Sequence, residues 1–167
     1  MRVAVIGVGL IGGSIGLAAR ERLGARVAGW DPDPEVLAAA VRCRAIDERR
    51  PDVAAAVAGA EIVFVAAPVG VLPEVVASAL AAAPDDCVLT DVGSTNRRVV
   101  AACRDPRFVG GHPLAGAETA GVEHARADLF AGATWYLTPH PATSGVLYER
   151  LHRALAAFGA QPTAIDA

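Results

Sequence analysis

Residues 2–17, RVAVIGVGLIGGSIGL, run from a short apolar segment into a glycine-rich segment with helical spacing. The first part, RVAVIG at 2–7, is rich in β-branched residues and predicts a buried strand. Residues 9–24 have the spacing of a helix, and Gly24 is suited to end it in a left-handed conformation. The stretch therefore predicts a strand, a tight turn and a helix at the start of the chain.

The turn, GVGLIG, contains the pattern G-x-G-x-x-G at Gly7, Gly9 and Gly12. Between a strand and a helix this pattern is typical of a dinucleotide-binding turn, although a plain strand–helix turn is the alternative. Gly7 permits the tight turn, Gly9 lets the backbone approach a pyrophosphate, and Gly12 lets the helix pack on the strand. The first N–H groups of the helix add donors for phosphate. The candidate cofactor-binding residues here are Gly7, Gly9, Leu10, Ile11 and Gly12.

The rest of the chain alternates β-rich and helical segments. Further strands are predicted at 25–31, 61–68, 87–93, 107–111, 134–139 and 161–166, and further helices at 33–42, 69–83, 95–104 and 145–159. Such alternation predicts βαβ units. We therefore expect an α/β fold over residues 1–167: a doubly wound, mostly parallel sheet of Rossmann type, with helices on both faces.

Composition excludes several classes of function. The net charge of -3 gives no basic footprint, so nucleic acid is not an expected partner. All fifteen basic residues are Arg, which excludes chemistry that needs a lysine amine. Cys43, Cys87 and Cys103 are scattered, so we expect idle thiols in a reducing, cytoplasmic compartment and no metal site. The apolar run at 53–72 is broken by glycine, glutamate and proline, so we expect a buried strand with helical flanks and no membrane contact.

Asp31 ends the second predicted strand, nineteen residues after Gly12. An acidic residue at this position is suited to accept hydrogen bonds from a ribose diol. The residues that follow Asp31 along the chain are Pro32 and Asp33, and no arginine stands beside it to pair with a 2′-phosphate. We therefore expect NAD as the cofactor in preference to NADP.

The segment AAPVGVLPEV at 66–75 ends another strand at the same edge of the sheet. Its apolar residues are expected to form a wall on the adenine and ribose side of the cofactor. Ala67, Pro68 and Leu72 are the candidates, and ordinary packing is an almost equal alternative for each of them.

Two polar residues follow the next two strands. Ser94 lies in DVGST at 91–95, where it either caps the following helix or points into the nicotinamide end of the crevice. His112 lies in GGHPLAGAE at 110–118, where Pro113 disfavours helical geometry at the histidine. A neutral imidazole at this edge is suited to accept or polarise an alcohol proton during hydride transfer. The remaining histidines, His124, His140 and His152, are expected at the surface.

Glu118 lies six residues after His112, beyond a loop that contains Gly116. We expect these two residues to contribute to substrate binding. The alternative for Glu118 is an exposed loop carboxylate without a special role.

Taken together, these stretches resemble the prephenate/arogenate dehydrogenases of tyrosine biosynthesis. The matching segments are GVGLIGGSIGLAAR at 7–20, GWDPDPE at 29–35, AAPV at 66–69, DVGSTN at 91–96 and GGHPLAGAETAGVEHARADLFAGATWYLTP at 110–139. The GGHP-x-AG segment, followed by LF-x-x-x-x-W-x-LTP, is far more specific than the glycine pattern.

The resemblance implies NAD-dependent oxidative decarboxylation of prephenate or arogenate. By the same resemblance, His112 hydrogen-bonds the ring hydroxyl, Ser94 contacts this hydroxyl and the nicotinamide, and Glu118 binds substrate or gates the site. Members of the family continue into a helical domain that dimerises and completes the site. We expect that domain to be absent here, so that the isolated nucleotide-binding domain binds NAD and turns over substrate poorly or not at all.

Two other functions stay open at this point. The β-hydroxyacid dehydrogenases share the glycine pattern, although the GGHPLAG segment argues against them. A non-catalytic NAD-binding module is the second alternative. The choice between prephenate and arogenate is not determined by these residues.

Overall fold

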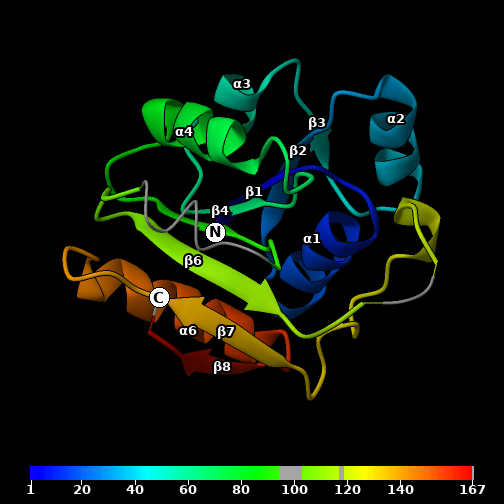
Figure 1. Ribbon diagram of the computed structural model, residues 1–167. Helices are drawn as coiled ribbons and strands as arrows, with labels where there is room; N and C mark the ends of the chain where they lie inside the picture. The colour runs from blue at the N-terminus through cyan, green and yellow to red at the C-terminus, as the bar shows by residue number, and fades with distance from the viewer. Residues whose placement is uncertain (95–102, 117–118, 167) are drawn as a thin grey trace.

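The computed structural model describes residues 1–94, 103–116 and 119–166. The described strands form one eight-stranded sheet in the order β3-β2-β1-β4-β5-β6-β7-β8 (Figure 1). Their bounds are β1 Arg2–Ile6, β2 Arg26–Trp30, β3 Glu48–Arg49, β4 Ile62–Val65, β5 Val88–Asp91, β6 Phe108–Pro113, β7 Thr134–Thr138 and β8 Gln161–Ala164. The first six strands of this order, from β3 through β2, β1, β4 and β5 to β6, pair with their neighbours in parallel, which confirms a mostly parallel α/β fold.

The helices cover both faces of the sheet. Their bounds are α1 Leu10–Leu23, α2 Pro34–Arg42, α3 Val53–Val57, α4 Leu72–Ala82 and α6 Gly145–Ala157, with a 3₁₀ turn, η1, at Val122–His124. One core cluster contains buried residues of α1, α2 and α6, and a second contains those of α3 and α4. Figure 1 shows α3 and α4 together on one side of the sheet, with α1 and α6 on the other.

Local signals placed most of these helices correctly. Gly24 follows α1 with φ 59° and donates its N–H to Ala19, as expected for a left-handed helix end. Asp33 precedes α2, and its side chain accepts a hydrogen bond from the N–H of Glu35, with Pro34 in the first turn. The expected helix at 95–104 lies largely outside the described residues.

The second half of the sheet departs from a purely parallel arrangement. Strand β6 pairs in parallel with β5 through Thr90 and Val109, and then pairs antiparallel with β7 from Gly110 to Pro113. Strand β8 runs parallel to β7 and forms the edge. The reversal occurs because the chain returns from β6 through a loop and η1 rather than through a full crossover helix on the sheet.

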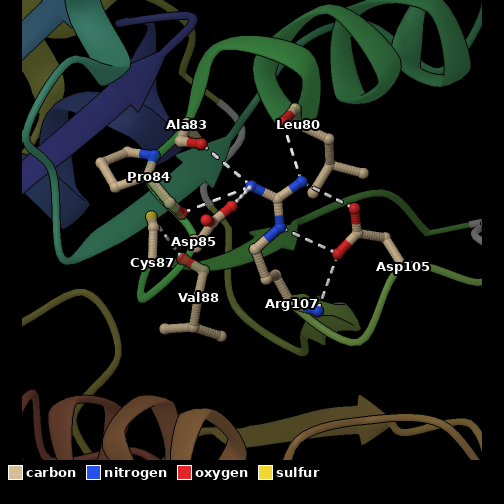
Figure 2. A network of polar contacts seen from close by, with 8 residues as sticks. All are labelled: Leu80, Ala83, Pro84, Asp85, Cys87, Val88, Asp105 and Arg107. Carbon is tan, nitrogen blue, oxygen red and sulfur yellow. Dashed lines mark hydrogen bonds and ion pairs between the residues drawn. The ribbon is translucent and has the colours of Figure 1, made fainter.

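Arg107 ties the amino end of β6 to the end of α4 (Figure 2). Its guanidinium donates to the carbonyl oxygens of Leu80, Ala83 and Pro84 at 2.9 to 3.3 Å, and to both carboxylate oxygens of Asp105. The carbonyls of Leu80 and Ala83 are among those that a helix leaves unpaired at its C-terminus. The hydrogen bond from Arg107 lowers the pKa of Asp105.

Two expectations about single residues are settled here. His140 is buried rather than exposed, because its Nε2 atom lies 3.0 Å from the Asp105 carbonyl oxygen and its Nδ1 atom accepts from the N–H of Ala142. The prediction of a surface position for His140 was therefore wrong. Cys87 is buried, and burial raises the pKa of its thiol to about 12, so it is unreactive near neutral pH.

The apolar run at 53–72 divides into α3, the buried strand β4 and the start of α4, as expected. Among the described residues, no helix has both the length and the apolar character required to cross a bilayer.

Candidate cofactor site and catalytic edge

The glycine turn connects β1 to α1 and lies at the carboxyl ends of the neighbouring strands β1 and β4. The strand order reverses between these two strands, so the chain connections on either side leave the sheet in opposite directions. Such a switch point is where doubly wound sheets bind ligands. Gly7 has φ 87°, and a Cβ atom there would lie 2.5 Å from the carbonyl oxygen of Ala66. A Cβ atom on Gly12 would lie 1.8 Å from the carbonyl oxygen of Gly7. Both positions therefore require glycine for the turn itself.

Gly9 differs from its two neighbours in the pattern. A Cβ atom on Gly9 would meet nothing within 4 Å, so its surroundings leave open space in front of the backbone. Gly9 is also the N-cap of α1, and no described side chain caps this helix end. The N–H groups of Leu10 and Ile11 in the first turn have no acceptor within the helix. The turn thus fits a phosphate group on steric and electrostatic grounds.

Asp31 follows β2 and faces this turn. Its Oδ2 atom accepts a hydrogen bond from the N–H of Val8 at 3.0 Å, and its Oδ1 atom accepts one from the N–H of Asp33 at 3.0 Å. A carboxylate oxygen has more than one lone pair, so both atoms can accept a further hydrogen bond from a ribose hydroxyl. Asp31 therefore fixes the glycine turn and keeps acceptor capacity for a ribose.

A cavity of about 670 Å³ opens beside Asp31. Its lining also includes Trp30, Arg49 and Arg50. No arginine follows Asp31 directly in the sequence, but the expectation that none lies beside it was wrong. Strand β3 pairs with β2 and brings Arg49 and Arg50 to the same edge of the sheet. Arg50 forms an ion pair with Glu48, whereas Arg49 is exposed.

The segment after β4 lies against the glycine turn. Ala67 is half-buried and its N atom would lie 3.2 Å from a Cβ atom on Gly7, while Pro68 is exposed. Leu72 has no exposed surface, because it packs in the core beneath Gly93. Of the three residues expected to wall the crevice, Ala67 and Pro68 have accessible surface, whereas Leu72 has none and so does not itself line a crevice.

Asp91, the last residue of β5, connects the next two segments of this edge. Its Oδ2 atom accepts from the N–H of Gly93 and its Oδ1 atom from the N–H of Gly111, each at 3.0 Å. Asp91 is fully buried, and burial raises the pKa of its carboxyl to about 6. Asp91 was not among the residues predicted to form the site, although an acidic residue at the end of a buried apolar strand was a usable signal.

The two candidate catalytic residues are the next residues after these glycines. Ser94 follows Gly93 and is exposed, and His112 follows Gly111 and is half-buried. The Nδ1 atom of His112 is buried and has no hydrogen-bond partner among the described residues. One carboxylate therefore holds the backbone immediately before both Ser94 and His112.

The loop after His112 is anchored at both ends. The N–H of Leu114 donates to the carbonyl of Thr134, and the N–H of Arg126 donates to the buried Oγ atom of Ser14 in α1. Gly116 is exposed within this loop, and Glu118 lies outside the described residues. His124, near the far end of the loop, is exposed as expected, and His152 on α6 is half-buried.

A family model described as the nucleotide-binding domain of prephenate dehydrogenase matches residues 15–163. The chain belongs to the prephenate dehydrogenase family. It is 36% identical over 163 residues to prephenate dehydrogenase of Bacillus subtilis strain 168, an alignment that covers 92% of this chain and 43% of that enzyme.

Solved structures in this family have the same fold. Arogenate dehydrogenase of Synechocystis superposes with a TM-score of 0.89 at 26% identity, covering 99% of this chain and 60% of that one. Prephenate dehydrogenase of Aquifex aeolicus, in complex with hydroxyphenyl propionate and NAD+, superposes with a TM-score of 0.89 at 27% identity and covers the same shares. The chain therefore spans less than half of the Bacillus enzyme and about three fifths of these structures.

Proposed function

We propose that this chain is the cofactor-binding part of an NAD-dependent prephenate or arogenate dehydrogenase. The observation that supports this most is the arrangement at one edge of the sheet. The open glycine turn, the Asp31 carboxylate and the pair Ser94 and His112 lie at the carboxyl ends of adjacent parallel strands. Membership of the family and the NAD+ complex of the Aquifex relative support the same cofactor.

The residues have distinct roles in this proposal. Gly9 and the first turn of α1 hold the pyrophosphate, Asp31 accepts the adenine-ribose hydroxyls, and Ala67 and Pro68 cover the cofactor from the side of β4. When bound, NAD supplies the hydride acceptor. The cavity with Trp30 and Arg49 takes the adenine end.

His112 accepts a hydrogen bond from the ring hydroxyl of the substrate through Nε2, because its other ring nitrogen, Nδ1, is buried. Ser94 orients that hydroxyl against the nicotinamide. Glu118 and Gly116 contribute to the substrate side of the crevice. The ring carbon gives up a hydride, the ring carboxylate leaves as CO2, and the ring becomes aromatic while keeping its oxygen as a hydroxyl. Because aromatisation drives the reaction, the residues mainly orient, polarise and exclude water.

Calorimetry with the purified chain tests this proposal. We expect NAD to bind, and we expect little or no turnover of prephenate or arogenate by the 167-residue chain alone. Robust turnover would contradict the role of a cofactor-binding part. NAD binding without any ternary binding of 4-hydroxyphenylpyruvate, the product formed from prephenate, would favour a non-catalytic module.

Any turnover that is measured serves to test His112. His112→Asn should keep NAD affinity within about twofold and lower the rate by about 10²–10⁴-fold, the usual contribution of a general acid–base group. The matched control is His124→Asn, at an exposed histidine, which should change neither quantity. An unchanged rate in His112→Asn would remove this residue from the mechanism.

A further inference from the structure

Asp91 is a buried carboxylate for which the proposed chemistry gives no direct task. It is fully buried at the end of β5. The groups that act on its carboxyl are backbone N–H groups, and no charged side chain of the described residues is among them. A buried carboxylate without a cation is unfavourable for the fold, so its presence calls for a compensating role.

Its position in the sheet indicates what that role is. The parallel ladder between β5 and β6 ends at Thr90 and Val109, and β6 then turns to pair with β7. The Asp91 carboxylate bridges the two segments just beyond this point, through 3.0 Å hydrogen bonds from Gly93 and Gly111. A side chain thus replaces the backbone ladder where the strands separate.

Both donors are held in narrow spaces. A Cβ atom on Gly111 would lie 2.4 Å from the Asp91 carbonyl oxygen and 2.5 Å from the Thr90 Oγ1 atom. A Cβ atom on Gly93 would lie 2.7 Å from Leu72 and 3.1 Å from the Asp91 Oδ2 atom. The carboxylate therefore fixes two backbone segments that have little freedom to shift.

From this geometry we infer that Asp91 is a positioning residue, whose ionised carboxylate sets the relative placement of Ser94 and His112 around the nicotinamide. This inference rests on the proposed function. A carboxylate accepts from both N–H groups at once, whereas a protonated carboxyl or an amide presents a donor to one of them. Loss of the charge should therefore disturb the nicotinamide end of the site and leave the adenine end intact.

The direction of the pH effect follows from burial, which raises the pKa of Asp91 to about 6. Above this pH the carboxylate is ionised and holds both segments. Near the donors lie the side chains of Leu72 from α4, Thr90 from β5 and Trp135 from β7, none of which ionises in this range. His112 on β6, the residue after Gly111, is the ionisable side chain next to these donors, so the test must separate its effect from that of Asp91.

The test compares NAD with ADP-ribose, which lacks the nicotinamide and retains every other part. Calorimetry gives the affinity of both ligands for the wild type, Asp91→Asn and Asp85→Asn. Asp85 is an exposed carboxylate in the loop before β5 and serves as the matched control. In Asp91→Asn we expect NAD affinity to fall by about tenfold or more, the effect of losing one charge-assisted hydrogen bond, and ADP-ribose affinity to change by less than about twofold.

A pH series on the wild type carries the test if the variant fails to fold. The ratio of NAD affinity to ADP-ribose affinity should fall as the pH drops from 7.5 to 5.0, with a midpoint near 6. The step should be absent in Asp91→Asn, in which His112 is unchanged, and present in Asp85→Asn. Equal changes for both ligands in Asp91→Asn, a flat ratio in the wild type, or a step that persists in Asp91→Asn would each overturn the inference. If neither ligand binds the wild type, the proposed function fails and the inference falls with it.

Discussion

The Oδ2 atom of Asp31 lies 3.0 Å from the backbone nitrogen of Val8, across the space between the end of β2 and the glycine turn. This hydrogen bond joins the acidic residue expected to bind ribose to the turn expected to bind pyrophosphate. The two halves of the adenine-side site are therefore built as one unit. Changing Asp31 should alter both the ribose contact and the glycine turn.

Asp31→Ser tests the preference for NAD. We expect NAD affinity to fall by about tenfold, because a ribose acceptor and the hydrogen bond to Val8 are both lost. We also expect measurable NADP binding, since Arg49 in the same cavity then faces a 2′-phosphate without a competing carboxylate. Calorimetry with both cofactors measures the change.

The double variant Asp31→Ser with Arg49→Ala should lose the NADP binding again. Asp128→Asn, at an exposed carboxylate, is the control and should bind NAD like the wild type. NADP binding that survives in the double variant would show that Arg49 is not the group that recognises the 2′-phosphate.

Alanine at Gly12 should mainly lower stability, whereas alanine at Gly9 should mainly lower NAD affinity. Gly12→Ala places a Cβ atom 1.8 Å from the Gly7 carbonyl oxygen and should lower the free energy of unfolding by about 3 kcal/mol. Gly9→Ala places its Cβ in open space, so we expect a loss of about 1 kcal/mol or less in stability and a clear loss of NAD affinity. Urea unfolding and calorimetry separate the two effects. NAD affinity that is unchanged in Gly9→Ala would place the pyrophosphate elsewhere.

The stability of the chain should carry a signature of Asp91. Burial raises the pKa of Asp91 from 3.8 to about 6 in the folded state. Between pH 3.8 and pH 6 the folded state therefore binds a proton at Asp91 more tightly than the unfolded state does. The contribution of Asp91 to stability is therefore greatest at low pH and is lost as the pH rises through about 6. Between pH 5 and pH 7 it should fall by about 1 kcal/mol.

Urea unfolding at pH 5 and pH 7 measures this difference. Asp91→Asn should lack this part of the pH dependence, and Asp85→Asn should retain it. A wild type and an Asp91→Asn variant with parallel pH profiles would show that Asp91 does not titrate in this range.

Arg107 should matter for stability and leave NAD binding unchanged. Arg107→Ala leaves the carbonyls of Leu80 and Ala83 without their donor, so the free energy of unfolding should fall by about 2–4 kcal/mol. Arg107→Lys keeps the charge without the forked geometry and should recover only part of the loss. The hydrogen bond from Arg107 lowers the pKa of Asp105, so this pair stabilises the fold at pH values above the unfolded pKa of Asp105 and loses that effect as the pH falls. Arg107→Ala lacks this contribution, so its stability should change less between neutral and acid pH. A weakened NAD affinity at unchanged fold would contradict a purely structural role.

The sequence predicted the parallel half of the fold because its signals are local. The glycine pattern, the Asp33–Pro34 helix start and the Gly24 helix end each depend on a few neighbouring residues. The same locality limited the prediction elsewhere. The two-residue strand β3 is too short for a periodic signal, and the antiparallel pairing of β6 with β7 depends on the route of the loop between them.

The candidate site shows the same division. Gly9 and Asp31 were predicted from spacing along the chain, and the structure brings Asp31 against the turn that contains Gly9. Arg49 and the bridging role of Asp91 were missed, because each depends on which strands become neighbours. The surface prediction for His140 failed for the same reason, since its partner Asp105 comes from a distant segment.

A crystal structure of the chain with NAD bound would show whether this edge of the sheet holds the whole cofactor. We expect the pyrophosphate at Gly9, the adenine ribose on Asp31, and the nicotinamide ring between the side chains of Ser94 and His112. A nicotinamide ring that lies away from both Ser94 and His112, with the adenine end still on Asp31, would contradict the proposed catalytic edge.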